Sequence, residues 1–177
     1  IYISSRSHVY LAKDKMSGEH VALKFPSAEL KNDTDYLEGL LREDWIAKRI
    51  DNPNVLKAKP PIRKQNFLYT VSEYIEGQNL MQWMIDNPKP SLEQVRHIVD
   101  QIAKGLQAFH RREMIHQDLR PHNIMIDAVG TVKIIDFGLS RHMKQGEKRQ
   151  DAVGTPTQLH LKSLKEHIPR SVTFRES

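Results

Sequence analysis

Apolar and polar residues alternate along the first part of the chain, with the two-residue period of β-strands. Val9 and Leu11 alternate with more polar neighbours, and a second apolar run begins at Val21. Residues 15–18 lie between the two runs and end in Ser-Gly, a typical turn sequence. The pattern predicts a β-hairpin within residues 1–25, which Pro26 ends.

The apolar period becomes helical over residues 36–50, and the sequence Asn-Pro-Asn then ends the segment at residues 52–54. Residues 66–75 (NFLYTVSEYI) combine aromatic and β-branched residues and are predicted to form a strand. The helically spaced apolar residues of the first segment are Tyr36, Leu37, Leu40, Leu41, Trp45, Ile46 and Ile50.

The second half of the chain has a mainly helical pattern. A short helix is predicted over residues 80–84, and a long helix begins after Ser91, where Gln94 completes a capping box. Two short strands follow at 124–126 and 132–135. Strands with one helix come first and helices follow, so the predicted fold class is α+β with two lobes. The long helix carries an apolar stripe made of Leu92, Val95, Ile98, Val99, Ile102, Leu106 and Phe109.

Composition excludes several classes of protein. The 177 residues include no cysteine, which excludes a disulfide scaffold and a thiolate metal site. The net charge of +5 comes mostly from residues 139–177, so a nucleic-acid-binding function is not favoured. No apolar run approaches the roughly 18 residues of a membrane span, and no signal peptide is visible. We therefore expect a cytoplasmic location, and a first residue other than Met suggests a fragment or a processed chain.

Four short motifs could carry chemistry. Lys24 ends the strand sequence Val-Ala-Leu-Lys, and Glu43 lies on the first predicted helix. Residues 116–123 (HQDLRPHN) form a loop between the long helix and a strand, and Asp-Phe-Gly follows the next strand at 136–138. Taken singly, Lys24 and Glu43 would be interpreted as a surface ion pair worth about 0–1 kcal/mol. Together and in this order, the motifs resemble the signature set of the protein kinase family over residues 1–156.

The resemblance implies a protein kinase-like fold and an ATP-dependent protein serine/threonine kinase that uses Mg²⁺. Lys24 would contact the α- and β-phosphates, and Glu43 would orient it. Asp118 would accept the proton of the substrate hydroxyl. Asn123 and Asp136 would bind Mg²⁺, a hard cation that prefers oxygen ligands. The substrate would be a protein with an accessible Ser or Thr, because Pro121 is typical of kinases of that class.

The same resemblance places the adenine site on the segment after residue 72. Ser72 would be the small gatekeeper, which predicts an open pocket behind it. The carbonyl of Glu73 and the N–H of Ile75 would bind adenine through the backbone. Three apolar side chains, Val9, Ala22 and Met125, would form the walls of the site.

Several positions depart from the family pattern. The phosphate-binding loop has Tyr2, Ser4 and Ser7 where the family has glycines, so we expect a stiffer loop and weak ATP binding. Gln117 replaces an arginine that pairs with a phosphorylated activation segment, which predicts that such phosphorylation is not the switch. Arg120 replaces a lysine but keeps the charge that contacts the γ-phosphate. The wording of these motifs resembles bacterial proteins in which the kinase domain follows a type-2C phosphatase domain.

The end of the chain departs most. Residues 139–156 resemble an activation segment, but residues 157–177 lack the Ala-Pro-Glu motif and the helices expected next. One reading frame of the codons for residues 159–162 would encode Ala-Pro-Glu, so we hypothesise a frameshift near residue 158. The simpler alternative is that these residues are a divergent tail on the surface of the protein. Without the missing helices, the apolar stripe cannot be fully covered, and the fragment is predicted to be inactive or weakly active.

The predicted organisation has three parts. Residues 1–75 form a small lobe and hinge, residues 76–156 form the first part of a large lobe, and residues 157–177 form an irregular tail. Two alternative functions stay open. One is a pseudokinase that binds nucleotide or acts as a scaffold, favoured by the glycine-free loop. The other is a small-molecule phosphotransferase, which shares the Asp, Asn and Asp of the site but is opposed by the complete Asp-Phe-Gly motif.

Overall fold

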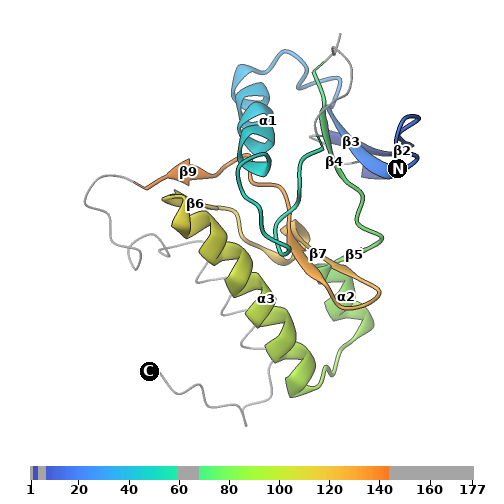
Figure 1. The fold of residues 1–177 in the computed structure, drawn as a ribbon, viewed down its shortest axis with the longest axis vertical. Helices are drawn as coiled ribbons and strands as arrows, with labels where there is room; N and C mark the ends of the chain where they lie inside the picture. The colour runs from blue at the N-terminus through green and yellow to red at the C-terminus, as the bar shows by residue number, and fades with distance from the viewer. Residues whose placement is uncertain (1, 4–6, 60–67, 144–177) are drawn as a thin grey trace.

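The computed structural model describes residues 2–3, 7–59 and 68–143. Within these residues, the N-terminal sheet contains four antiparallel strands in the order β1-β2-β3-β4. Figure 1 labels β2, β3 and β4 of this sheet. The strands are β1 (Tyr2–Ile3), β2 (Ser7–Lys13), β3 (His20–Pro26) and β4 (Thr70–Glu73). The predicted hairpin is confirmed, since β2 pairs with β3 along its whole length. Its turn contains Gly18 with a φ of 74°, a conformation that glycine adopts without strain.

The first helix, α1 (Thr34–Ala47), covers most of the segment predicted from the apolar period. It begins earlier than predicted because Asp33 caps it by accepting a hydrogen bond from the Tyr36 N–H at 2.8 Å. The chain then returns towards the second lobe. Leu56 N–H donates to the Ile134 carbonyl, and Ile134 N–H donates to the Asn54 carbonyl, both at 2.9 Å. This pairing joins the segment after α1 to the strand that precedes Asp136.

The strand predicted over residues 66–75 is shorter in the structure. Residues 66–67 lie outside the described part of the chain, and β4 ends at Glu73. Tyr74 and Ile75 leave the sheet because they connect it to the second sheet, which begins with β5 (Gly77–Asn79). Their aromatic and β-branched side chains favour a strand locally, but the crossing between lobes determines the backbone there.

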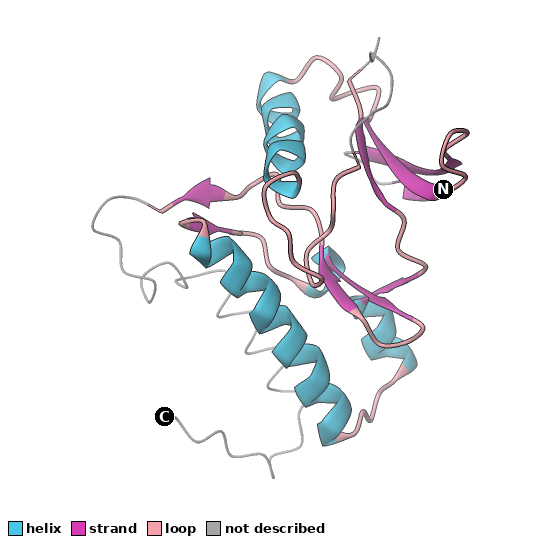
Figure 2. Ribbon diagram, in the orientation of Figure 1, coloured by secondary structure: helices cyan, strands magenta, loops and turns pink. Residues whose placement is uncertain are grey.

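In the described part of the chain, the second lobe contains two α-helices and two small sheets. Figure 2 shows its helices in cyan and its strands in magenta. The predicted short helix is α2 (Leu80–Asp86), and the long one is α3 (Leu92–Arg111). Ser91 and Gln94 form the predicted capping box. One small sheet has the order β5-β7-β8 and the other pairs β6 with β9. The strands of these sheets not yet given are β6 (Met114–Ile115), β7 (Ile124–Asp127), β8 (Val132–Ile134) and β9 (Arg141–His142). The 3₁₀ turn η1 (Pro121–Asn123) directly precedes β7.

The main apolar core joins α3 to the small sheets and to the end of α1. Ile98, Ile102 and Phe109 of the predicted stripe are buried in it. Leu92 and Val99 remain 41% and 44% exposed, so the described residues cover only part of the stripe. The α+β class with two lobes is confirmed, whereas the boundaries at residues 75 and 156 stay predictions.

Candidate active site

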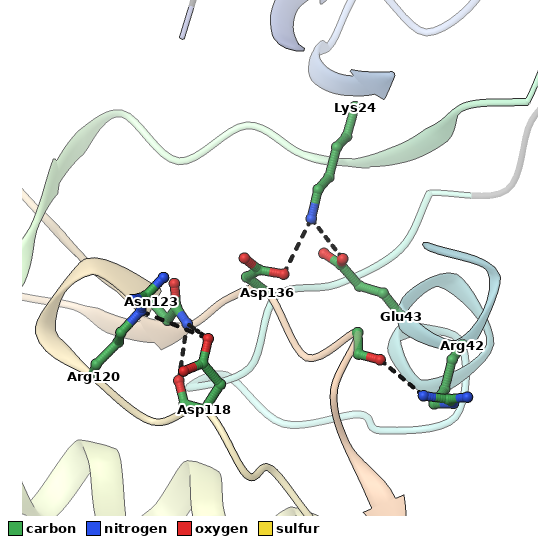
Figure 3. Close-up of polar contacts among 8 residues, drawn as sticks. Lys24, Arg42, Glu43, Asp118, Arg120, Asn123 and Asp136 are labelled. Atoms are coloured by element: carbon green, nitrogen blue, oxygen red, sulfur yellow. Dashed lines mark hydrogen bonds and ion pairs between the residues drawn. The ribbon is translucent and has the colours of Figure 1, made fainter. Parts of the chain in front are cut away.

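Lys24 and Glu43 lie side by side between the sheet and α1. The Lys24 Nζ is 2.6 Å from Glu43 Oε2 and 3.3 Å from Asp136 Oδ1 (Figure 3). Strand β3 delivers the lysine, α1 delivers Glu43, and the turn after β8 delivers Asp136. Three segments far apart in the sequence therefore meet at one ammonium group. Among the predicted site residues, these three form one cluster.

Both side chains of the Lys24–Glu43 pair have shifted pKa values. Burial acts to lower the pKa of Lys24, but the carboxylates of Glu43 and Asp136 outweigh it and raise that pKa well above its usual range. Burial also raises the pKa of Glu43, and the attraction of Lys24 does not fully offset it because Asp136 adds repulsion. The Lys24 ammonium thus forms ion pairs with two carboxylates, and these keep the lysine charged.

A second cluster forms on the loop between β6 and β7. The buried Asn123 amide nitrogen donates to the Asp118 carbonyl at 2.9 Å and to Asp118 Oδ2 at 2.8 Å. Arg120 Nε lies 3.6 Å from the same Asp118 oxygen. Figure 3 shows this group beside the Lys24 cluster. The turn η1 fixes Asn123 at its end, so the orientation of the Asp118 carboxylate follows from the backbone of this loop.

Asp136 and Phe137 occupy opposite environments. The Asp136 backbone has a φ of 56°, a left-handed conformation that is uncommon for a residue other than glycine. Its side chain is 49% exposed, whereas Phe137 is fully buried. The Phe137 ring packs edge-on against Phe109 at 5.5 Å and against His116 at 6.3 Å. Burying the phenyl ring beneath this turn therefore leaves the carboxylate half-exposed beside Lys24.

Helix α1 also contacts the backbone next to Phe137. Arg42 Nη1 donates to the Gly138 carbonyl at 3.1 Å. A Cβ atom on Gly138 would lie 3.0 Å from the Gly39 carbonyl oxygen. Arg42 and Gly39 are not among the predicted site residues, because a bond to a backbone carbonyl leaves no pattern in the sequence. They fix the helix that carries Glu43 against the turn that carries Asp136.

The residues predicted to bind adenine lie on strands of two different sheets. The register pairs Val9 with Lys24 and Ala22 with Ser72, which places all four side chains on one face of the sheet. Met125 lies on β7 in the other sheet, opposite Asn79. These residues therefore lie on the sheets of both lobes. Their roles, like that of Ile75, stay predictions.

Glu73 has a second set of contacts besides its predicted backbone role. Its Oε1 accepts from the Lys57 N–H at 2.9 Å and from Lys133 Nζ at 2.7 Å. A hollow of about 320 Å³ adjoins this pair and is lined by residues 73–76, 127–129 and 133. None of Lys24, Asp118 and Asp136 lines it, so it is distinct from the Lys24 and Asp118 clusters described above. The Glu73–Lys133 pair links β4 of one lobe to β8 of the other.

Some predicted features lie outside the described residues. Ser4 of the phosphate-binding loop, the Gly-Thr-Pro sequence at 154–156 and the tail at 157–177 belong to this group. Tyr2 lies in β1, and the buried Ser7 begins β2. No helix among the described residues is both long enough and apolar enough to span a membrane.

Comparison of the sequence with known proteins identifies a family. A model of the protein kinase domain matches residues 5–159. The chain is 31% identical over 134 residues to serine/threonine-protein kinase PrkC of Bacillus subtilis (strain 168), covering 76% of this chain and 21% of that protein. It is 33% identical over 156 residues to calcium-dependent protein kinase 4 of Plasmodium falciparum (isolate 3D7), covering 85% of the chain and 29% of the relative.

A plant relative agrees with these two. The SNF1-related protein kinase catalytic subunit alpha KIN12 of Arabidopsis thaliana is 30% identical over 153 residues, with 86% of this chain and 31% of that protein covered. The chain thus spans between 21% and 31% of the length of these relatives. The fold and the family match together define the class of this chain as a protein kinase domain. The chain belongs to the protein kinase domain family, and its named relatives are serine/threonine and calcium-dependent protein kinases.

Proposed function

We propose that this chain carries the site of an ATP-dependent protein serine/threonine kinase, which transfers the γ-phosphoryl group to a protein hydroxyl. One observation supports this most strongly: Lys24 bonds both Glu43 and Asp136, beside an Asp118 carboxylate that Asn123 orients. Phosphoryl transfer asks the protein mainly to position the reactants and to neutralise charge. A fixed cation and an oriented carboxylate on facing elements meet those two needs.

Each residue contributes a separate task. The Lys24 ammonium, held by Glu43, would bind phosphate oxygens. The Asp118 carboxylate would accept the hydroxyl proton of the substrate and orient its oxygen. Arg120, which is exposed and lies near Asp118, would bind the transferred phosphoryl group by charge. The bonds from Asn123 to Asp118 keep the carboxylate in place while the proton moves.

The oxygen donors also suit magnesium. The Asn123 nitrogen is engaged by Asp118, so its side-chain oxygen is the atom that could ligate a cation. Asp136 adds a half-exposed carboxylate on the neighbouring turn. Hard oxygen ligands of this kind fit Mg²⁺, which would neutralise phosphate charge when it is bound with ATP.

We expect nucleotide affinity and turnover to be low. Ser7 stands where the family has a glycine, and a serine backbone approaches phosphate less closely. Part of the α3 stripe is also exposed, which costs stability. The same glycine-free segment favours the alternative of a pseudokinase that binds nucleotide without transfer. The upstream phosphatase domain, the cytoplasmic location and the frameshift stay predictions.

The test separates binding from transfer. The purified chain is titrated with a fluorescent ATP analogue in Mg²⁺ and then incubated with labelled ATP and Ser/Thr peptides. Asp118→Asn should keep nucleotide affinity and lower transfer by roughly 10²–10⁴-fold. The control is Asp51→Asn, which removes a charge from a side chain that is 90% exposed.

Each outcome points to one function. Slow transfer to peptide that depends on Asp118 supports the proposal. Nucleotide binding without transfer would favour the pseudokinase. Phosphorylation of small alcohols in place of peptides would identify a small-molecule phosphotransferase.

A further inference from the structure

The segment after the Asp-Phe-Gly turn pairs with the segment that leads into the catalytic loop. Strand β9 runs antiparallel to β6, with Arg141 opposite Ile115 and His142 opposite Met114. The Met143 N–H donates to the Glu113 carbonyl at 2.7 Å, which extends the pairing by one residue. Figure 1 shows β6 and β9 side by side at the end of α3. The backbones that carry Asp118 and Asp136 are therefore joined beyond the catalytic residues themselves.

Side chains reinforce this pairing at its catalytic end. Ser140 is fully buried, and its hydroxyl donates to the His116 carbonyl at 3.2 Å. With its amide oriented to satisfy both neighbours, Gln117 donates to the Leu139 carbonyl at 3.0 Å and accepts from Arg141 Nε at 2.9 Å. One amide thus contacts two points on the opposing segment. Gln117 precedes Asp118 directly in the chain.

The backbone of Gln117 is in an unusual conformation. Its φ is 66°, in the left-handed region that disfavours residues with a Cβ. Such a conformation persists when the surrounding contacts require it. The two hydrogen bonds of the Gln117 side chain anchor this residue, so they oppose a change of its backbone to a more favourable conformation. The direction in which the chain enters Asp118 depends on that conformation.

The two neighbours of this side chain best suit a neutral group with both a donor and an acceptor. An amide supplies a donor for the Leu139 carbonyl and an acceptor for the Arg141 guanidinium. A lysine or arginine there would place a second positive charge against Arg141 and would offer no acceptor. A glutamate would keep the acceptor and attract Arg141, but would lose the donor. The glutamine therefore fits its two neighbours better than a charged residue.

We infer that Gln117 is a positioning residue for Asp118: its amide fastens the catalytic loop to residues 139–141 and thereby holds the loop's left-handed turn. The inference rests on the proposed function for its effect on catalysis. Its structural half, the fastening of the two segments, does not depend on phosphoryl transfer.

Hydrogen exchange measured by mass spectrometry tests the fastening in the full chain. We expect Gln117→Ala to speed amide exchange in peptides covering residues 139–143 about fivefold, the effect of losing one net hydrogen bond. Gln117→Gly should do the same although glycine tolerates the backbone conformation, which separates the side chain from backbone strain. Gln117→Glu should restore most of the protection, and Gln117→Arg should exchange faster than Gln117→Ala.

A matched control is available on α3. Gln107 is exposed and accepts a hydrogen bond from Arg111 at 3.1 Å, so Gln107→Ala also removes a glutamine–arginine contact. It should leave exchange in residues 139–143 unchanged. Gln117→Ala should lower kcat while the KM for ATP stays constant, and Gln117→Glu should recover part of kcat.

The result that overturns the inference is equally direct. Unchanged exchange in Gln117→Ala, or an arginine variant that exchanges like the unmodified chain, would show that the amide fastens nothing. A fall in kcat with unchanged exchange would also contradict it. If the unmodified chain transfers no phosphate, the proposed function fails, and the exchange measurement still decides whether Gln117 holds the segment.

Discussion

Gly39 on α1 and Gly138 after Phe137 touch through their backbones, without side chains between them. A Cβ on Gly138 would lie 3.0 Å from the Gly39 carbonyl oxygen, while one on Gly39 would lie 3.4 Å from the Gly138 oxygen. The contact is therefore unequal, because only the first distance forces the neighbour to move. Replacing each glycine in turn by alanine therefore tests the two halves of the contact separately.

We expect Gly138→Ala to lower the free energy of unfolding by about 1–3 kcal/mol, the usual cost of overpacking. Gly39→Ala should instead raise it by up to about 1 kcal/mol, because alanine favours the helix and its methyl group fits. Urea denaturation of the two variants measures the difference. Equal effects of the two substitutions would contradict the unequal contact.

The Lys24–Glu43 pair predicts an unequal response as well. Lys24→Met leaves the nearly buried Glu43 carboxylate without its cation, which should cost about 3 kcal/mol of stability. Glu43→Leu leaves Lys24 beside the half-exposed Asp136 and should cost less. The double variant should be more stable than Lys24→Met alone. Denaturation of all four proteins gives the coupling energy, and simple additivity would show that the two groups do not interact.

The third prediction concerns two buried amides, Asn54 on the segment after α1 and Gln101 on α3, which both bond to β8. Asn54 Nδ2 donates to Gln101 Oε1 at 2.9 Å and to the Val132 carbonyl at 2.8 Å. The same Gln101 oxygen accepts from the Val132 N–H, and its nitrogen donates to the Gly130 carbonyl. Gln101→Ala would leave these groups unsatisfied.

We expect Gln101→Ala to lower the free energy of unfolding by about 2–3 kcal/mol, because buried polar groups lose their partners. Gln107→Ala on the exposed face of the same helix should change it by less than about 0.5 kcal/mol. Thermal denaturation compares the two. Similar melting temperatures would show that solvent replaces the lost bonds.

The features that the sequence could predict depend on neighbours in the chain. The hairpin and the Ser91–Gln94 capping box are local, and the structure confirms both. The meeting of Lys24 with Glu43 followed from the family resemblance, since no local pattern joins two residues on separate elements. Their catalytic roles stay predictions.

The features that the sequence could not predict involve backbone partners far along the chain. Arg42 and Gln117 bond to backbone carbonyls, which every residue carries, so neither bond leaves a pattern in the sequence. The end of the β4 strand at Glu73 was missed for a related reason. Local propensity continued through Ile75, but the crossing between lobes overrode it.

The final prediction concerns the response to acid, and it rests on the buried His116, two residues before Asp118. Burial lowers the pKa of this imidazole, against smaller opposing effects from the Ile135 backbone and the carboxylates of Asp118 and Asp136. Its Nδ1 accepts a hydrogen bond from the Asp118 N–H at 3.2 Å, so the neutral form is the one that fits. Protonation would remove that acceptor and place a charge against Phe109 and Phe137.

The sign of the pH effect follows from proton counts. Below a pH of about 6.5, His116 in the unfolded chain binds a proton, while the folded chain does not until its lowered pKa is reached. Stability should therefore fall as the pH falls through this window, by at most about 1.4 kcal/mol per pH unit from this one group. His116→Phe keeps an aromatic ring but cannot titrate. Urea midpoints at several pH values should fall more steeply for the unmodified chain than for His116→Phe, and parallel curves would show that the buried imidazole does not control the acid response.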